Sequence, residues 1–242
     1  MKKTFLLITS LFFFTSCDKE AILSSLNSIF NSSIIYTENT TSEELDNSNS
    51  SNDITEDSTS SSSSEESSTT ENYKEKIKIY INPSVQVNNI YYDKITTEAQ
   101  TMNIVGKMIY DELSKDDRFI VYINDRMLKL SDSIKESNSY NVDYHLALHT
   151  NAGGGSGSEA FYYSNSYFAK MLLSDFVSTH SFPNRGVKKA TNLYELKNST
   201  AKNKSLIEFL FHDNKTESEY IKNNYTSLAQ SVVKTFDRIA NN

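Results

Sequence analysis

An abrupt change of composition near residue 76 is the feature that most constrains how this chain can fold. Residues 18–75 are dominated by Ser, Asn, Thr and Glu, as in segment 58–64, which is serine apart from Thr59 and is followed by Glu65 and Glu66. Such a segment can bury too little apolar surface to offset the entropy lost on ordering it. We therefore predict a disordered tether over residues 17–75 and one folded domain over residues 76–242, long enough for a single core.

The N-terminus has the pattern of an export signal. Two lysines precede an apolar core at residues 5–14, which is too short to cross a bilayer as a helix of about 20 residues. The core ends in Phe14-Thr15-Ser16-Cys17, which resembles a bacterial lipobox, although Phe14 stands where leucine is usual. This predicts a lipoprotein signal peptide over residues 1–16, a lipid on Cys17, and anchoring to the extracellular face of the cell membrane. An ordinary secretory signal with an incidental cysteine is the alternative.

The charge of the chain is unevenly distributed. The net charge is −7, which argues against a nucleic-acid partner. Residues 18–75 carry 13 acidic and 2 basic side chains and residues 1–17 carry two lysines, so residues 76–242 have a net charge of +2. A mildly basic domain is compatible with an anionic polymer such as cell wall. Because Cys17 is the only cysteine, no disulfide can form within the chain.

Strand and helix patterns alternate after residue 76. Isoleucines alternate with polar residues from residue 77, and Thr97 followed by Gln100 resembles a capping box that opens a helix. Strands are further expected at 119–123, 143–149 and 206–211, and helices at 167–178 and 217–239. We predict an α/β fold: a single open, mostly parallel twisted sheet with helices on both faces.

Two polar residues stand out in apolar strands. His149 ends the run Tyr144-His145-Leu146-Ala147-Leu148, and Glu208 lies inside Leu206–Phe211. A glutamate buried there without a partner would be unfavourable, so it requires a metal, a cation or a catalytic role; a structural salt bridge is the alternative. His145 and His149 cannot share one metal, because four residues of strand span about 13 Å. His145 is therefore expected in the core or behind the site.

Several segments together resemble the zinc-dependent N-acetylmuramoyl-L-alanine amidases of the clostridial and phage type. Leu146-Ala147-Leu148-His149-Thr150-Asn151-Ala152 is similar to the family's zinc-binding strand end. Further similar segments follow the family's order from residue 77 to 236: Asn82-Pro83-Ser84-Val85-Gln86 with Asn88, Gly157-Ser158-Glu159, Arg185-Gly186-Val187-Lys188, Asn192-Leu193-Tyr194-Glu195-Leu196, and Ile207-Glu208-Phe209-Leu210-Phe211-His212-Asp213-Asn214.

The resemblance implies roles for individual residues. Glu98 matches the zinc ligand that opens the family's first helix, His149 the ligand at the strand end, and Glu208 the catalytic base. Asn151 and Glu159 are candidates for substrate contact or for supporting the site, although loop-capping roles are equally open for them. Arg185 could face the carboxylates of the stem peptide or could only fix its own loop.

The family's first zinc-binding histidine is absent, because Val85 occupies its position. A hydrolytic zinc site uses three protein ligands and keeps one position open for water. Gln86, the next residue, has an amide oxygen that could be the third ligand, or it could only hold the loop. His180 and His212 are less favoured replacements.

The resemblance implies a peptidoglycan hydrolase that uses zinc-activated water to cleave the amide between N-acetylmuramic acid and L-alanine. The alternative is a catalytically impaired amidase-fold module that binds cell wall or a partner protein. A protein activator is a further expected partner. The chain lacks the Gly-x-Ser-x-Gly motif of serine hydrolases with an α/β-hydrolase fold. A purely structural lipoprotein would leave Glu208 unexplained.

Overall fold

The computed structural model describes residues 75–242, so the predicted signal peptide, Cys17 and almost all of the predicted tether lie outside the described residues. Six strands form one sheet in the order β2-β1-β3-β6-β4-β5. Their bounds are β1 Ile77–Pro83, β2 Phe119–Ile123, β3 Tyr144–Asn151, β4 Ser158–Tyr162, β5 Asn184–Lys189 and β6 Asn203–Phe211. All neighbouring strands are parallel except β4 and β6, which are antiparallel. The predicted mostly parallel sheet is confirmed.

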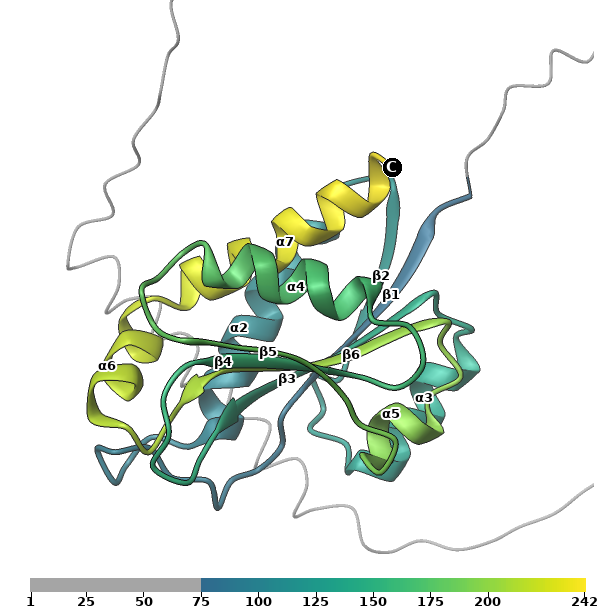
Figure 1. Cartoon of the computed structure of the whole chain (residues 1–242). Helices are drawn as coiled ribbons and strands as arrows, with labels where there is room; N and C mark the ends of the chain where they lie inside the picture. The colour runs from purple at the N-terminus through teal and green to yellow at the C-terminus, as the bar shows by residue number, and fades with distance from the viewer. Residues whose placement is uncertain (1–74) are drawn as a thin grey trace, which may run out of the picture. The chain divides into compact units, whose positions relative to one another are not determined.

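Helices cover both faces of this sheet (Figure 1). On one face lie α2 (Glu98–Leu113), α4 (Tyr167–Val177) and α7 (Tyr225–Ala240), and on the other lie α3 (Leu130–Ser139) and α5 (Tyr194–Asn198). The short helix α6 (Lys215–Asn223) follows β6. None of the helices within residues 75–242 is long and apolar enough to cross a membrane.

The main core lies between the sheet and the layer of helices α2, α4 and α7. Ile79 and Ile81 of β1, Leu146 and Leu148 of β3, and Phe236 of α7 are among its members, all with no exposed surface. Tyr80, which points to the opposite face of β1, is also fully buried. The central strands are therefore covered on both faces, as parallel sheets generally are.

A local signal explains where α2 begins. The Thr97 side chain accepts a hydrogen bond from the Gln100 backbone N–H, and the Gln100 side chain accepts one from the Thr97 backbone N–H, so the predicted capping box is confirmed. This box places Glu98 at the first turn of α2. The single helix expected over 217–239 is wrong: Asn224, at φ −133° and ψ 32°, separates α6 from α7.

Candidate functional site

Polar residues converge at the carboxyl ends of β1, β3 and β6. A cavity of about 400 Å³ opens there, and its lining includes Val85, Gln86, His149, Glu195 and Glu208. In open α/β sheets, ligands bind outside the carboxyl ends of strands, where the connecting loops diverge. The cavity is therefore in the position that the fold favours for a site.

Glu98 and His149 form the innermost pair. Glu98 is fully buried, and its Oε1 lies 2.8 Å from His149 Nδ1. The carboxylate also accepts hydrogen bonds from the Thr150 backbone at 3.2 Å and from the Asn89 side chain at 2.6 Å. These four groups come from the end of β3, the start of α2 and the loop between β1 and α2, so the pair joins three parts of the fold.

Each member of this pair stabilises the charged form of the other. Burial alone would lower the pKa of His149, but the hydrogen bond to Glu98 and the charges of Glu208, Glu98 and Glu195 raise it to about 9. Burial likewise opposes ionisation of Glu98, yet the hydrogen bond and charge of His149 outweigh burial and lower the pKa of that carboxyl. The metal-free pair is therefore an imidazolium and a carboxylate at neutral pH.

Gln86 reaches the same pair from the loop after β1. Its Nε2 lies 3.3 Å from His149 Nδ1, and its Oε1 accepts a hydrogen bond from Asn89 at 2.9 Å. Asn89 thus links Gln86 to Glu98, since it donates to both. Val85 lines the cavity beside Gln86 but offers no donor atom. The structure accordingly brings Gln86, Glu98 and His149 together.

Glu208 faces the same cavity from β6. It stands opposite His149 in the register of β3 and β6, and opposite Glu159 in the register of β6 and β4. Its Oε2 is a buried atom without a hydrogen-bond partner. Burial raises the pKa of Glu208, the charge of His149 lowers it, and the charges of Glu98 and Glu159 raise it, with a net value of about 7. The alternative, a structural salt bridge, is not formed by this oxygen.

Glu159 is held by three side chains from two strands, β3 and β5. Asn151 Nδ2 donates to its Oε1 at 2.6 Å, Arg185 Nε lies 3.3 Å from its Oε2, and Lys188 contacts the same oxygen. The Arg185 guanidinium also lies 4.9 Å from the centre of the Phe211 ring. Asn151, Glu159 and Arg185 therefore form one connected group, with the Arg185 side chain 35% exposed at its rim.

Glu195 is a residue of this cavity that sequence reasoning did not single out. It lies in the first turn of α5 and is 4% exposed. Its Oε1 accepts from Asn82 at 2.5 Å and from His145 at 2.8 Å, while its Oε2 lies 4.0 Å from His149 Nε2. The only signal in the sequence was its place in the segment 192–196, which carried no role of its own.

The other histidines lie in structural positions. His145 is fully buried, as predicted, and bonds to Ser137 as well as to Glu195. His212 is buried, stacks on Tyr91 and bonds to Thr150. His180 contacts the Ser158 hydroxyl and packs against aromatic rings, among them Phe176. Neither His180 nor His212 contacts Glu98 or His149 in the hydrogen bonds and ring contacts of the described residues.

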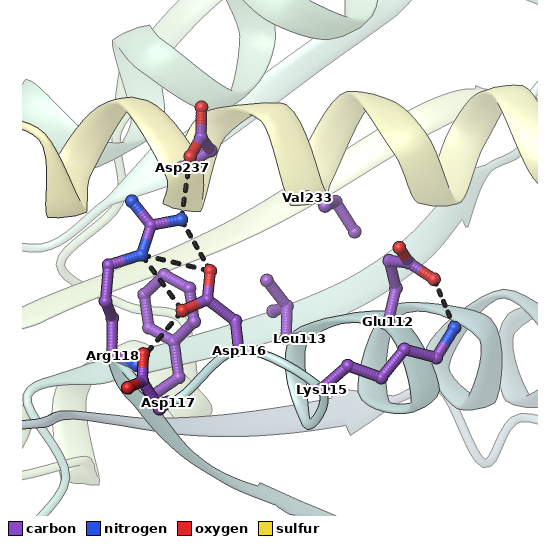
Figure 2. Close-up of a pocket in the computed structure, with 9 residues that line it drawn as sticks. Glu112, Leu113, Lys115, Asp116, Asp117, Arg118, Val233 and Asp237 are labelled. Atoms are coloured by element: carbon purple, nitrogen blue, oxygen red, sulfur yellow. Dashed lines mark hydrogen bonds and ion pairs between the residues drawn. The ribbon is translucent and has the colours of Figure 1, made fainter.

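A second cavity, of about 480 Å³, lies at the opposite ends of the strands, between α2, α7 and the start of β2 (Figure 2). Its charged side chains largely pair with each other: Lys115 with Glu112, and Arg118 with both Asp116 and Asp237 (Figure 2). These pairs are exposed and contribute little to stability. The cavity holds none of the residues proposed for chemistry.

The donor chemistry of the first cavity fits a divalent cation. Three carboxylates, Glu98, Glu195 and Glu208, act on the imidazole of His149, and Glu195 also bonds to His145. The buried carboxylates thus outnumber the imidazoles, and a cation would offset their charge. Carboxylate oxygen and imidazole nitrogen are both zinc ligands. Among residues 75–242, no three His, Cys, Asp or Glu side chains are grouped closely enough to hold a metal. With Glu98 and His149 as two donors, Gln86 Oε1 is a third oxygen of this group; it accepts from Asn89, whereas Nε2 is the Gln86 atom that faces His149.

Comparison with known proteins identifies the family of this chain. The sequence profile of the N-acetylmuramoyl-L-alanine amidase family matches residues 86–237, well over half of the chain. The chain belongs to this amidase family. The match runs from Gln86 into α7 and therefore includes Glu98, His149, Glu195 and Glu208.

Individual amidases share moderate similarity with the chain. The amidase CwlM of Bacillus licheniformis is 26% identical over 170 residues, which are 65% of this chain and 65% of CwlM. The chain thus spans about two thirds of that relative's length. The crystal structure of an amidase from Clostridium difficile 630 superposes with a TM-score of 0.61 at 21% identity, over 66% of this chain and 95% of that one.

A further solved amidase is similar in fold. CwlD from Clostridioides difficile, solved in complex with the lipoprotein GerS, has a TM-score of 0.56 at 15% identity, over 67% of this chain and 97% of that one. At this identity the similarity concerns the fold alone.

Proposed function

We propose that the chain is a zinc-dependent peptidoglycan hydrolase that cleaves the amide between N-acetylmuramic acid and the L-alanine of the stem peptide. The observation that carries the proposal is Glu208: its Oε2 is buried without a hydrogen-bond partner, in the cavity that also holds His149. A buried carboxylate oxygen without a hydrogen-bond partner lowers the stability of the fold, so its presence points to a function. Membership of the amidase family supplies the reaction class.

Glu98, His149 and Gln86 would hold the zinc. When bound, zinc supplies Lewis acidity that polarises the amide carbonyl and makes water more nucleophilic. The Gln86 amide is a weaker donor than the imidazole it replaces, so this site should bind zinc less tightly than one with two histidines. Asn89, which bonds to both Gln86 and Glu98, keeps the loop donor beside the helix donor.

Glu208 would move the proton. Its Oε2 accepts a proton from the water that attacks the lactyl carbonyl carbon, and it then donates this proton to the alanine nitrogen as the C–N bond breaks. Burial raises the pKa of Glu208 to about 7. A group with that pKa can accept and release a proton at neutral pH, as general acid–base catalysis requires.

Asn151, Glu159 and Arg185 would bind substrate beside the cavity, since Glu159 stands opposite the cavity residue Glu208 in the register of β4 and β6. The partly exposed Arg185 is held by Glu159 and by the Phe211 ring, so its guanidinium is oriented. A stem peptide carries carboxylates that such a guanidinium can bind. Glu159 would orient Arg185, and Asn151 would hold Glu159.

Residues 1–16, Cys17 and the segment 17–75 would place the enzyme at its substrate. A lipid on Cys17 would anchor the chain to the extracellular face of the cell membrane, under the wall. A flexible chain of this length has a root-mean-square span on the order of 40 Å, which would let the domain reach nearby wall. The complex of CwlD with a lipoprotein supports, by analogy, a protein partner for this chain, and an activating role of that partner stays a prediction.

Release of L-alanine amino groups tests the proposed reaction. The protein lacking residues 1–17 is incubated with purified peptidoglycan and zinc, beside Glu208→Ala and Glu219→Ala, which changes an exposed glutamate of α6. We expect release by the parent and by Glu219→Ala, and none by Glu208→Ala. Equal release by Glu208→Ala would contradict the role of Glu208. Binding to peptidoglycan without release by any of the three would favour the impaired wall-binding module that Val85 suggests.

A further inference from the structure

We propose that Glu195 is a positioning residue for His149: it holds the proton of His149 on Nε2 and so leaves Nδ1 for the metal. The inference rests on the proposed zinc function, which it deepens by naming a residue behind the ligands. It also assigns a role to the segment 192–196, which the reaction itself does not use.

Glu195 is built into the wall of the cavity behind His149. It is 4% exposed, and α5 carries it there from the face of the sheet opposite the main core. Its Oε1 is fixed by Asn82 Nδ2 at 2.5 Å and by His145 Nε2 at 2.8 Å. The other oxygen, Oε2, lies at ion-pair distance, 4.0 Å, from His149 Nε2. One carboxylate therefore connects the two histidines of β3.

The tautomer of His145 shows how this carboxylate directs protons. A carboxylate only accepts hydrogen bonds, so His145 Nε2, which faces Glu195 Oε1, carries a proton. Its Nδ1 can then accept from the Ser137 hydroxyl, which lies 2.8 Å away. His145 is thus fully bonded inside the core, and it anchors Glu195 from behind.

The two nitrogens of His149 face different partners. Nδ1 faces Glu98 and Gln86, the two other proposed ligands, at 2.8 and 3.3 Å. Nε2 faces Glu195. A metal-bound histidine must present a bare nitrogen, and its other nitrogen usually donates its proton to a carboxylate or a carbonyl. If zinc displaces the Nδ1 proton, Glu195 keeps the proton on Nε2 and orients the ring.

The buried surroundings of Glu195 limit its alternatives. Since Oε1 is already occupied by Asn82 and His145, the part of the carboxylate that remains available is Oε2. Oε2 points toward the cavity that Glu195 and His149 both line. The contacts of Oε1 with Asn82 and His145 suffice to fix Glu195 in the structure. The position of Oε2 near His149 Nε2 is therefore the observation that favours a role toward His149.

Zinc affinity of the metal-free protein tests the inference without any substrate. This affinity is measured by competition with a chromophoric chelator. The proteins compared are residues 18–242 of the parent and the same protein with Glu195→Gln or with Asp175→Asn. Asp175 is a matched control: it is also a buried carboxylate, 2% exposed, but it bonds to Thr235 and Arg238 between α4 and α7. We expect Glu195→Gln to weaken zinc binding by about 10- to 100-fold, as loss of a carboxylate behind a ligand does elsewhere. Asp175→Asn should lower thermal stability and leave zinc affinity unchanged.

A second variant and a second readout cover the case in which Glu195→Gln does not fold. Glu195→Asp keeps the charge and draws the carboxylate away from His149 by one methylene. It should weaken zinc binding less than Glu195→Gln, and the visible spectrum of bound Co²⁺ should shift in both variants because the ring is reoriented.

Parental zinc affinity and an unchanged cobalt spectrum in both folded variants would overturn the inference and leave the proposed reaction intact. Failure of the parent itself to bind zinc would overturn the zinc function, and the inference with it. Zinc binding by the parent without release of L-alanine would contradict only the proposed reaction.

Discussion

His149 Nδ1 lies 2.8 Å from Glu98 Oε1, although 51 residues separate the two in the sequence. The contact forms because β3 ends where α2 begins, next to the loop that follows β1. Thr150 N, the neighbouring backbone group, donates to the same carboxylate oxygen at 3.2 Å. This relationship sets the ligand geometry on which the following predictions depend.

The Glu208→Gln variant should remove a pH dependence of stability from the metal-free protein. Glu208 has an ordinary pKa of 4.5, which burial raises to about 7, so the folded state holds this proton more tightly than the unfolded state. Its contribution is fully present below pH 4.5 and is lost as pH rises to about 7. The loss is up to about 3 kcal/mol. Urea unfolding from pH 4 to 7.5, with a chelator present, measures it.

A parallel loss of stability in Glu208→Gln would show that other groups cause the dependence. The difference between parent and variant is informative because Glu98 and Glu195 have lowered pKa values, and their contributions are lost in the opposite direction, as pH falls.

The Gln86→Ala variant should bind zinc more weakly, because it removes the amide that stands beside His149 and Glu98. Val85→His, added to that variant, should restore binding, since imidazole is a stronger zinc donor than an amide. We expect each change to shift the zinc dissociation constant by on the order of tenfold. Chelator competition measures both. Unchanged affinity in Gln86→Ala would assign Gln86 to the loop alone.

The Gly157→Ala variant should destabilise the fold far more than Gly153→Ala. Both glycines have positive φ, +97° and +108°, which side chains rarely adopt. At Gly157 a Cβ would also lie 2.1 Å from the Pro183 carbonyl oxygen, whereas at Gly153 it would meet nothing within 4 Å. We expect losses of about 3 and about 1 kcal/mol in urea unfolding. Equal losses would mean that the loop before β4 shifts without cost.

The Arg185→Ala variant should raise KM for peptidoglycan by roughly tenfold while changing kcat less, if Arg185 binds substrate carboxylates outside the reacting bond. Lys189→Ala is a suitable control, because Lys189 is an exposed cation of the same strand. Steady-state release of L-alanine amino groups separates the two constants. A loss confined to kcat would place Arg185 near the reacting atoms, contrary to this expectation.

Several elements were predictable because their signals are local. The alternation at 77–81 predicted β1, the pair Thr97 and Gln100 predicted the start of α2, and apolar runs predicted β3 and β6. Other elements carry weak local signals. The helix 130–139 is rich in serine, and α5 has five residues. The strand 184–189 has no buried residue, so its sequence lacks the pattern of a core strand.

The sequence by itself determined the α/β character of the domain. It also placed Glu98 at the start of a helix, His149 at the end of an apolar strand and Glu208 inside another apolar strand. Periodicity and capping are short-range properties, so they can be recognised without knowing the fold. Only the tertiary structure placed Glu195 between His145 and His149, and left Glu208 Oε2 buried without a partner. These contacts depend on the order β1-β3-β6 in the sheet and on where α5 packs, and long-range packing of this kind leaves no local pattern.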